Sequence, residues 1–196
     1  MRDEAERKAD SEAVEIGARR WRDAEGVTAV TVRRAQPGDA TRLVALAEEI
    51  GSEPEGWLIS ERRWRSAGDE RRYLKAVRRH PDAAVFVAET DSEIVGRLSI
   101  SRDPHPASRH VADLGLMVAA SARRRGIGWA LLDEAVAWAR ASDVRKLELH
   151  VFPHNEPAIR LYERFGFVRE GYRTQQFRRG STYVDAILMA YDVESR

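Results

Sequence analysis

Cysteine is absent from this chain of 196 residues. The protein can therefore form no disulfide, hold no metal through thiolate ligands and use no acyl-cysteine intermediate. If the chain catalyses group transfer, this absence favours direct attack by the acceptor over a covalent intermediate on cysteine.

A strong net charge and long apolar runs are also missing. The chain carries 33 Lys and Arg against 32 Asp and Glu, a net charge of +1, so it has no strong overall attraction to nucleic acid or membrane surfaces. No apolar run approaches the roughly 20 residues of a bilayer-spanning helix. Residues 1–10 are densely charged and lack the apolar core of a signal peptide. We therefore expect a cytoplasmic protein that binds neither nucleic acid nor membrane.

The length and a composition of 43% hydrophobic and 33% charged residues are typical of one globular domain with a short appendage. Residues 1–28 differ from the rest, because acidic residues outnumber basic ones and apolar residues are scattered. We expect a charged N-terminal extension there, solvated and either partly helical or disordered. A docking arm that uses Trp21 is the alternative. The folded domain is expected at 29–192.

Hydrophobic periodicity predicts the secondary structure of that domain. Alternating or short apolar runs indicate strands at 30–33, 84–89, 93–101, 111–118, 147–152, 167–177 and 182–191. Helical spacing indicates a helix after Gly38-Asp39, with Leu43, Ala45, Leu46 and Ile50 on its apolar face, and helical regions at 56–79, 127–141 and 156–165. This order predicts an α/β fold in which helices flank a central mixed sheet of about seven strands.

A glycine-containing loop follows the strand at 111–118. It consists of Arg123, Arg124, Arg125, Gly126, Ile127 and Gly128, and the helical pattern continues from Trp129. Glycines let backbone N–H groups turn toward an anion at a helix N-terminus, where the helix dipole adds partial positive charge. Neighbouring arginines can neutralise more than one phosphate charge. The loop therefore predicts a diphosphate site.

A second pattern lies about thirty residues further along the chain. Tyr162 follows Asn155 by seven residues on one short predicted helix, which Gly166 ends. A phosphate site followed by a separately supplied hydroxyl indicates a phosphate-bearing carrier and a proton donor for its leaving group.

The two patterns together resemble the GNAT superfamily of N-acetyltransferases. The loop of that family reads Gln/Arg-x-x-Gly-x-Gly/Ala, and Arg123, Gly126 and Gly128 fill it. Its later motif reads Asn-x-x-Ala-x-x-Leu-Tyr-x-x-x-Gly-Phe, which is filled by Asn155, Ala158, Leu161, Tyr162, Gly166 and Phe167. The resemblance covers roughly 29–192. Arg124 departs from the family, which often has glycine there, and we interpret it as an additional cation.

The resemblance implies acetyl-CoA as co-substrate and an amine as acceptor. It places the pantetheine arm along Leu116, Met117 and Val118, where a backbone N–H can bind the thioester oxygen as it gains charge. It makes Tyr162 the general acid, since a phenol is protonated at neutral pH; a purely packed tyrosine is the alternative. Asn155 would contact the pantetheine arm or a water, cap its helix, or do both.

The sequence leaves the general base open between two residues. Asp113 lies on the strand at 111–118, where many family members carry a glutamate. His150 lies near the end of the strand at 147–152, where some members that acetylate protein N-termini place a catalytic side chain. An imidazole accepts protons near neutral pH, whereas an aspartate would need a raised pKa or a bridging water. His150 and His154 are four residues apart, but with no third ligand nearby we expect no metal.

The acceptor is not identified by the sequence. A small amine, an amino-acid derivative or a protein N-terminus would each fit, and a catalytically weak CoA-binding or sensing module is the alternative function. A homodimer is possible. The segment at 62–79 is basic, which fits a solvated helix or, as the second choice, an acidic substrate or partner. In the family this part of the chain walls the acceptor pocket, so Trp57, Trp64 and Tyr73 could shape it.

Overall fold

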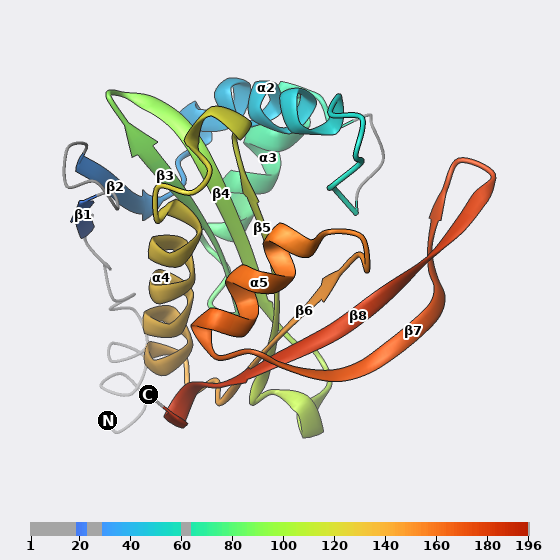
Figure 1. Ribbon diagram of the computed structural model, residues 1–196. Coiled ribbons are helices and arrows are strands. Elements are labelled where there is room, and N and C mark those ends of the chain that lie inside the picture. The colour runs from blue at the N-terminus through green and yellow to red at the C-terminus, as the bar shows by residue number, and fades with distance from the viewer. Residues whose placement is uncertain (1–18, 23–28, 60–63, 196) are drawn as a thin grey trace, which may run out of the picture.

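The computed structural model describes residues 19–22, 29–59 and 64–195. They form one eight-stranded sheet in the order β1-β2-β3-β4-β5-β6-β8-β7 (Figure 1). The strands are β1 Arg19–Arg22, β2 Ala29–Arg34, β3 Ala83–Thr90, β4 Glu93–Arg102, β5 Val111–Val118, β6 Lys146–Val151, β7 Val168–Arg179 and β8 Thr182–Asp192. β5 and β6 run parallel, and the other described neighbours run antiparallel.

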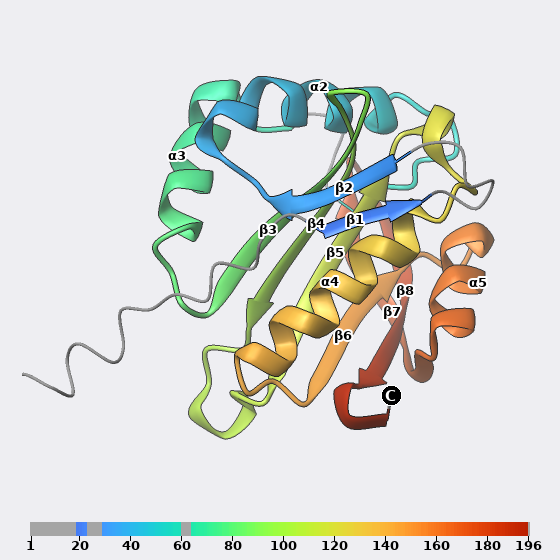
Figure 2. The ribbon, with the colours of Figure 1, turned by 90° about the vertical axis from the view of Figure 1, so that its left-hand side faces the viewer.

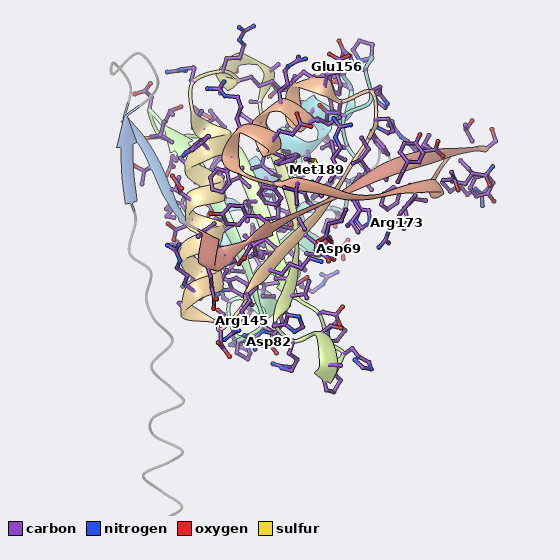
Figure 3. All side chains as sticks on the ribbon, turned by 60° about the horizontal axis from the view of Figure 1, so that its bottom comes forward. Asp69, Asp82, Arg145, Glu156, Arg173 and Met189 are labelled. Carbon is purple, nitrogen blue, oxygen red and sulfur yellow. The ribbon has the colours of Figure 1, made fainter. Side chains whose placement is uncertain are left out.

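Helices cover both faces of this sheet (Figure 2). They are α2 Ala40–Gly51, α3 Ala67–Val77, α4 Ile127–Ala141 and α5 Glu156–Phe165, with short 3-10 turns at Pro37–Asp39, Pro106–Ser108, Ala120–Ala122 and Val193–Ser195. α4 and α5 lie on one face, and α2 and α3 lie on the other. Met189 of β8 has no exposed surface and lies near the centre of the molecule (Figure 3). The predicted mixed sheet flanked by helices is confirmed.

Two details of the secondary-structure prediction are wrong. The region at 56–79 is helical only from Ala67 to Val77, and 60–63 lie outside the described residues. The helix begins there because the Ser66 hydroxyl accepts a hydrogen bond from the Asp69 N–H at 3.1 Å, a capping signal that the sequence contained. Ala45 is exposed, and Ala47 takes its place on the buried face of α2.

The parallel pairing of β5 with β6 is short. It joins Val111 to Lys146, Ala112 to Leu147 and Asp113 to Glu148, and then stops. Beyond this point β5 stays paired with β4 and β6 stays paired with β8, so the two strands separate (Figure 1). Residues 114–118 of β5 therefore have no described strand on the β6 side, which leaves backbone groups of that edge available to another extended chain.

Strand β1 lies within the segment that we expected to be an extension. Arg19–Arg22 pairs antiparallel with β2, with Trp21 opposite Val30. The rest of 1–28 lies outside the described residues, so the boundary at residue 28 stays a prediction.

We expect deletion of 1–28 to lower the melting temperature, because β2 loses a strand partner, whereas deletion of 1–18 should leave it unchanged. Thermal unfolding of both truncated proteins and of the full chain measures this. Equal melting temperatures for all three would show that the pairing with β1 contributes nothing to stability.

Candidate active site

The glycine loop forms the start of α4. Gly126 is the N-cap residue with φ 80°, a left-handed conformation that costs glycine nothing. The first backbone hydrogen bond of the helix runs from the Ala130 N–H to the Gly126 carbonyl at 3.0 Å, so the N–H groups of Ile127 and Gly128 precede the intrahelical ladder. They lie at the positive end of a 15-residue helix dipole, which suits a diphosphate.

Two arginines of the loop differ in their surroundings. Arg123 donates to both carboxylate oxygens of Glu53, at 2.7 and 2.6 Å, and its Nε donates to the Val118 carbonyl at 3.1 Å. Its guanidinium therefore ties the segment after α2 to the end of β5. Arg124 is exposed and has φ 65°, a conformation that explains the family's frequent glycine at this position. Diphosphate binding by either arginine stays a prediction, and Arg124 is the more accessible of the two.

The two sequence motifs meet where α4 packs against α5. A Cβ atom on Gly128 would lie 2.7 Å from Leu161 Cδ2, so no side chain fits there without movement. Next to this contact, the Trp129 ring packs edge-on against Phe165 at 4.9 Å between centroids. Gly128 thus permits close packing of the two helices, in addition to any contact with a ligand.

Tyr162 lies on the inner side of α5. Its side chain is buried and packs against Phe167. Burial raises the pKa of its hydroxyl above the ordinary phenol value, so the group is protonated at neutral pH and able to donate. At the start of the same helix, the Asn155 side-chain oxygen accepts a hydrogen bond from the Ala158 N–H at 3.2 Å. Asn155 is thus a helix cap whose amide nitrogen is not used by that bond.

The two candidates for the general base are neighbours. Asp113 on β5 and His150 on β6 come together where the strands begin to separate, with 3.7 Å between Asp113 Oδ2 and His150 Nδ1. The aspartate is mostly exposed, and the imidazole is mostly buried against Phe177 of β7. His150 Nε2 is buried and has no hydrogen-bond partner. The two side chains are close enough for one acceptor nitrogen to contact both.

The acid and the base candidates approach the separated strands from opposite faces. Leu147, Leu149 and Val151 of β6 are buried on the face of α4, so His150 points to the other face. Tyr162 is buried on α5, and α5 lies on the same face of the sheet as α4 (Figures 1 and 2). A carrier and an acceptor could therefore meet between β5 and β6 from opposite sides.

Aromatic side chains close the end of β6. The His154 ring stacks on Phe152 and Trp57, and His154 Nε2 lies 3.2 Å from the Glu55 carbonyl oxygen. Arg179 of β7 donates to the Gly56 carbonyl at 2.8 Å. The segment after α2 and the β7–β8 hairpin thus touch each other across this end. Sequence reasoning found Trp57 but missed Arg179, because the contact joins residues far apart in the chain.

An open hollow of about 810 Å³ lies elsewhere, between α5 and β7, with Ile159 and Tyr172 in its lining. Asp113, His150 and Tyr162 are not part of it, so it is separate from the candidate catalytic centre.

Within the described part of the chain, no three His, Asp or Glu side chains are grouped so that they could hold a metal ion. Across the same residues, no helix combines the length and apolar character needed to cross a membrane.

Fold and site together define a class of enzyme. The two parallel strands diverge, the N-terminus of α4 follows the end of β5, and a buried tyrosine is protonated at neutral pH. These features suit an enzyme that transfers an acyl group from a phosphate-bearing thioester carrier.

Comparison with known proteins agrees with this class. A model of the acetyltransferase (GNAT) family matches residues 43–167. The chain is 38% identical over 114 residues to the L-amino acid N-acetyltransferase AaaT of Escherichia coli, covering 56% of this chain and 68% of that protein. It is 32% identical over 120 residues to an N-alpha-acetyltransferase of Sulfurisphaera tokodaii, covering 56% and 69%. A GNAT acetyltransferase structure from Streptococcus pneumoniae aligns with a TM-score of 0.75 at 27% identity, covering 83% of this chain and 99% of that one. The chain belongs to the acetyltransferase (GNAT) family and is an acetyl-CoA-dependent N-acyltransferase.

The neighbouring arginines of the loop allow a matched test. Arg124→Met should weaken acetyl-CoA binding by about two- to five-fold, the usual contribution of one exposed cation, without changing the melting temperature. Arg123→Met should lower the melting temperature by about 2–4 °C, because the half-buried Glu53 loses both of its hydrogen bonds. Calorimetric titration and thermal unfolding measure the two effects. If Arg123→Met weakened acetyl-CoA binding more than Arg124→Met and left the melting temperature unchanged, Arg123 would be the ligand-binding arginine and not the structural one.

Tyr162→Phe keeps the ring and removes the hydroxyl. We expect kcat to fall by about two orders of magnitude while the melting temperature holds, because packing and not hydrogen bonding surrounds this side chain. The matched control is Tyr172→Phe, which removes an exposed hydroxyl bonded to Asp185 and should leave kcat unchanged. Normal turnover in a folded Tyr162→Phe protein would refute the role of general acid.

Proposed function

We propose that this chain transfers the acetyl group of acetyl-CoA to the primary amine of a free amino acid or a similarly small molecule, by direct attack in a ternary complex. The observation that carries the proposal is the Asp113–His150 pair at the point where β5 and β6 separate, with α5, the helix of Tyr162, on the α4 face of the sheet. A base on one side can deprotonate the acceptor ammonium, and an acid on the other side can protonate the departing sulfur.

The residues divide the chemistry as follows. The Asp113–His150 pair takes a proton from the acceptor ammonium where Asp113 Oδ2 and His150 Nδ1 face each other, since His150 Nε2 is buried. The nitrogen lone pair can then attack the thioester carbonyl carbon. A backbone N–H among Leu116, Met117 and Val118 stabilises the negative charge that develops on the carbonyl oxygen.

The new C–N bond forms as the C–S bond breaks. Tyr162 donates its proton to the departing sulfur, which leaves as a thiol. The nitrogen of the adduct releases its remaining surplus proton, which returns through water to the tyrosinate, so that a neutral amide forms and Tyr162 is restored. Acetyl-CoA supplies the activated acetyl thioester, and its diphosphate would lie at the N-terminus of α4, where the N–H groups of Ile127 and Gly128 precede the intrahelical ladder.

A small acceptor is favoured by the closure at the end of β6. The Arg179–Gly56 hydrogen bond and the His154–Glu55 contact join the segment after α2 to β7 and to the loop after β6. Such bridges favour a single amino acid over a polypeptide as the acceptor. The similarity to an L-amino acid N-acetyltransferase supports the same choice. Acetylation of a protein N-terminus is the second candidate, supported by the similarity to an N-alpha-acetyltransferase.

A screen of acceptors tests the proposal. Purified protein is incubated with acetyl-CoA and free amino acids, simple primary amines or short peptides, and release of free CoA is measured. We expect turnover with at least one amino acid at a kcat/KM above that of any peptide. Turnover confined to peptides would replace the proposal with the second candidate, and no turnover with any amine would favour a CoA-binding module.

The pH dependence of one good acceptor identifies the base. If His150 accepts the proton, kcat/KM rises with pH as the imidazole loses its proton, and His150→Gln should abolish that rise. Asp113→Asn keeps the size of the side chain and removes its charge, so it should lower kcat/KM and leave the rise in place. The exposed His110 provides the control, and His110→Gln should leave the profile unchanged.

Two other outcomes are informative. A rise that survives His150→Gln and disappears in Asp113→Asn would make Asp113 the base. A profile that neither substitution alters would mean that the amine loses its proton to bulk water, and both assignments would fail.

A further inference from the structure

Two arginines near the acceptor face of the sheet share a single buried carboxylate. Glu70 on α3 has a side-chain exposure of 0% and lies 3.3 Å from Arg65 and 3.4 Å from Arg97. Arg97 on β4 is 6% exposed, whereas Arg65, just before α3, is 39% exposed. Two guanidinium charges against one carboxylate leave the cluster with a net positive charge.

This positive charge is not neutralised by the other described neighbours. The guanidinium of Arg65 lies 4.3 Å from the centre of the Tyr73 ring, and that of Arg97 lies 5.0 Å from the centre of the Trp64 ring. Aromatic rings attract cations but carry no net charge. Both Glu70 oxygens and Arg97 Nε are buried without a hydrogen-bond partner. The cluster therefore carries a positive charge that the described side chains around it do not fully neutralise, and Arg65 is its exposed member.

The register of β4 and β5 places this cluster on the same face as the catalytic pair. Arg97 lies opposite Met117, Ser99 opposite Gly115, and Ser101 opposite Asp113. Alternate residues of a strand share a face, so these positions form a row that runs from the cluster to Asp113 over roughly 13 Å. The acceptor nitrogen must approach the thioester beside residues 116–118, which lie at the Arg97 end of the row because Met117 is opposite Arg97.

The middle of this row is small and open. Gly115 is exposed, and within 4 Å a Cβ atom added there would meet only the Ser99 hydroxyl, at 3.5 Å. An acceptor can therefore lie over Gly115 and Ser99 with its amine toward Asp113 and His150. A second polar group on the same molecule would then point toward Arg65.

We propose that Arg65, held by Glu70 and Tyr73 and supported by the buried charge of Arg97, binds the carboxylate of the acceptor and determines a preference for amines that carry one. The proposal rests on the proposed function and adds the residue that selects the substrate class. A guanidinium can donate two parallel hydrogen bonds to a carboxylate, and the charge on both partners strengthens them.

The test uses two acceptors that differ by the carboxylate alone, L-phenylalanine and 2-phenylethylamine. Arg65→Gln should lower kcat/KM for L-phenylalanine by about ten-fold or more, the usual effect of losing a charge-assisted hydrogen bond, mainly through KM. Its kcat/KM for 2-phenylethylamine should stay within about two-fold of wild type. Because each ratio compares variant with wild type on one acceptor, differences in amine basicity cancel.

Two further variants complete the design. Arg65→Lys keeps the charge but loses the planar fork, so it should restore part of the activity toward L-phenylalanine. Arg72→Gln removes an exposed arginine of α3 that pairs with Asp69, and it should leave both acceptors unaffected. Melting temperatures of all variants show that the fold is retained.

The possible failures are distinguishable. If wild-type protein acetylates neither acceptor nor any other amine, the proposed function fails. If it acetylates amines but Arg65→Gln changes both acceptors equally or neither, the carboxylate site fails and the proposed function stands.

Discussion

The short parallel contact between β5 and β6 is the constraint on which the site depends. Pairing stops after Asp113 and Glu148, and each strand continues only with its antiparallel neighbour. The separation leaves an unpaired backbone edge on β5 and brings the side chains of Asp113 and His150 within 3.7 Å. It also lets α5 place Tyr162 on the opposite side. Donor and acceptor can therefore reach one point without crossing the sheet.

Packing between α4 and α5 links the glycine loop to the helix that carries Tyr162, the proposed general acid. A Cβ atom on Gly128 would lie 2.7 Å from the end of the Leu161 side chain, so this glycine lets the two helices pack without displacing the leucine. Tyr162 follows Leu161 directly on α5 and packs against Phe167. Gly128 therefore permits close packing of the two helices, in addition to any approach of a ligand.

Arginines of similar sequence context have different roles because their surroundings differ. Arg123 is held by Glu53 and contributes to the connection between α2 and β5, whereas Arg124 is exposed in a left-handed conformation. Arg97 is almost fully buried, and Arg65 is half exposed above Tyr73. Whether one of these arginines can bind a ligand depends on its exposure and on the number of carboxylates beside it. The density of positive charge along the chain does not decide this.

Local patterns in the sequence determined most of the secondary structure. The bounds of β5, α4 and α5 agree with hydrophobic periodicity, and the end of α5 agrees with Gly166. These signals are readable because periodicity and capping act between residues a few positions apart. For the same reason the two motifs could be recognised, and with them the family.

Contacts between distant residues were decided only by the tertiary structure. The sequence offered Asp113 and His150 as rival bases, and the register of β5 with β6 makes them neighbours. The partner of Arg123, Glu53, lies 70 positions away and has no spacing signal. Strand β1 was missed because a short charged strand has little periodicity and forms through pairing with β2. Strand register and ion pairing join segments whose separation along the chain carries no information about their distance in space.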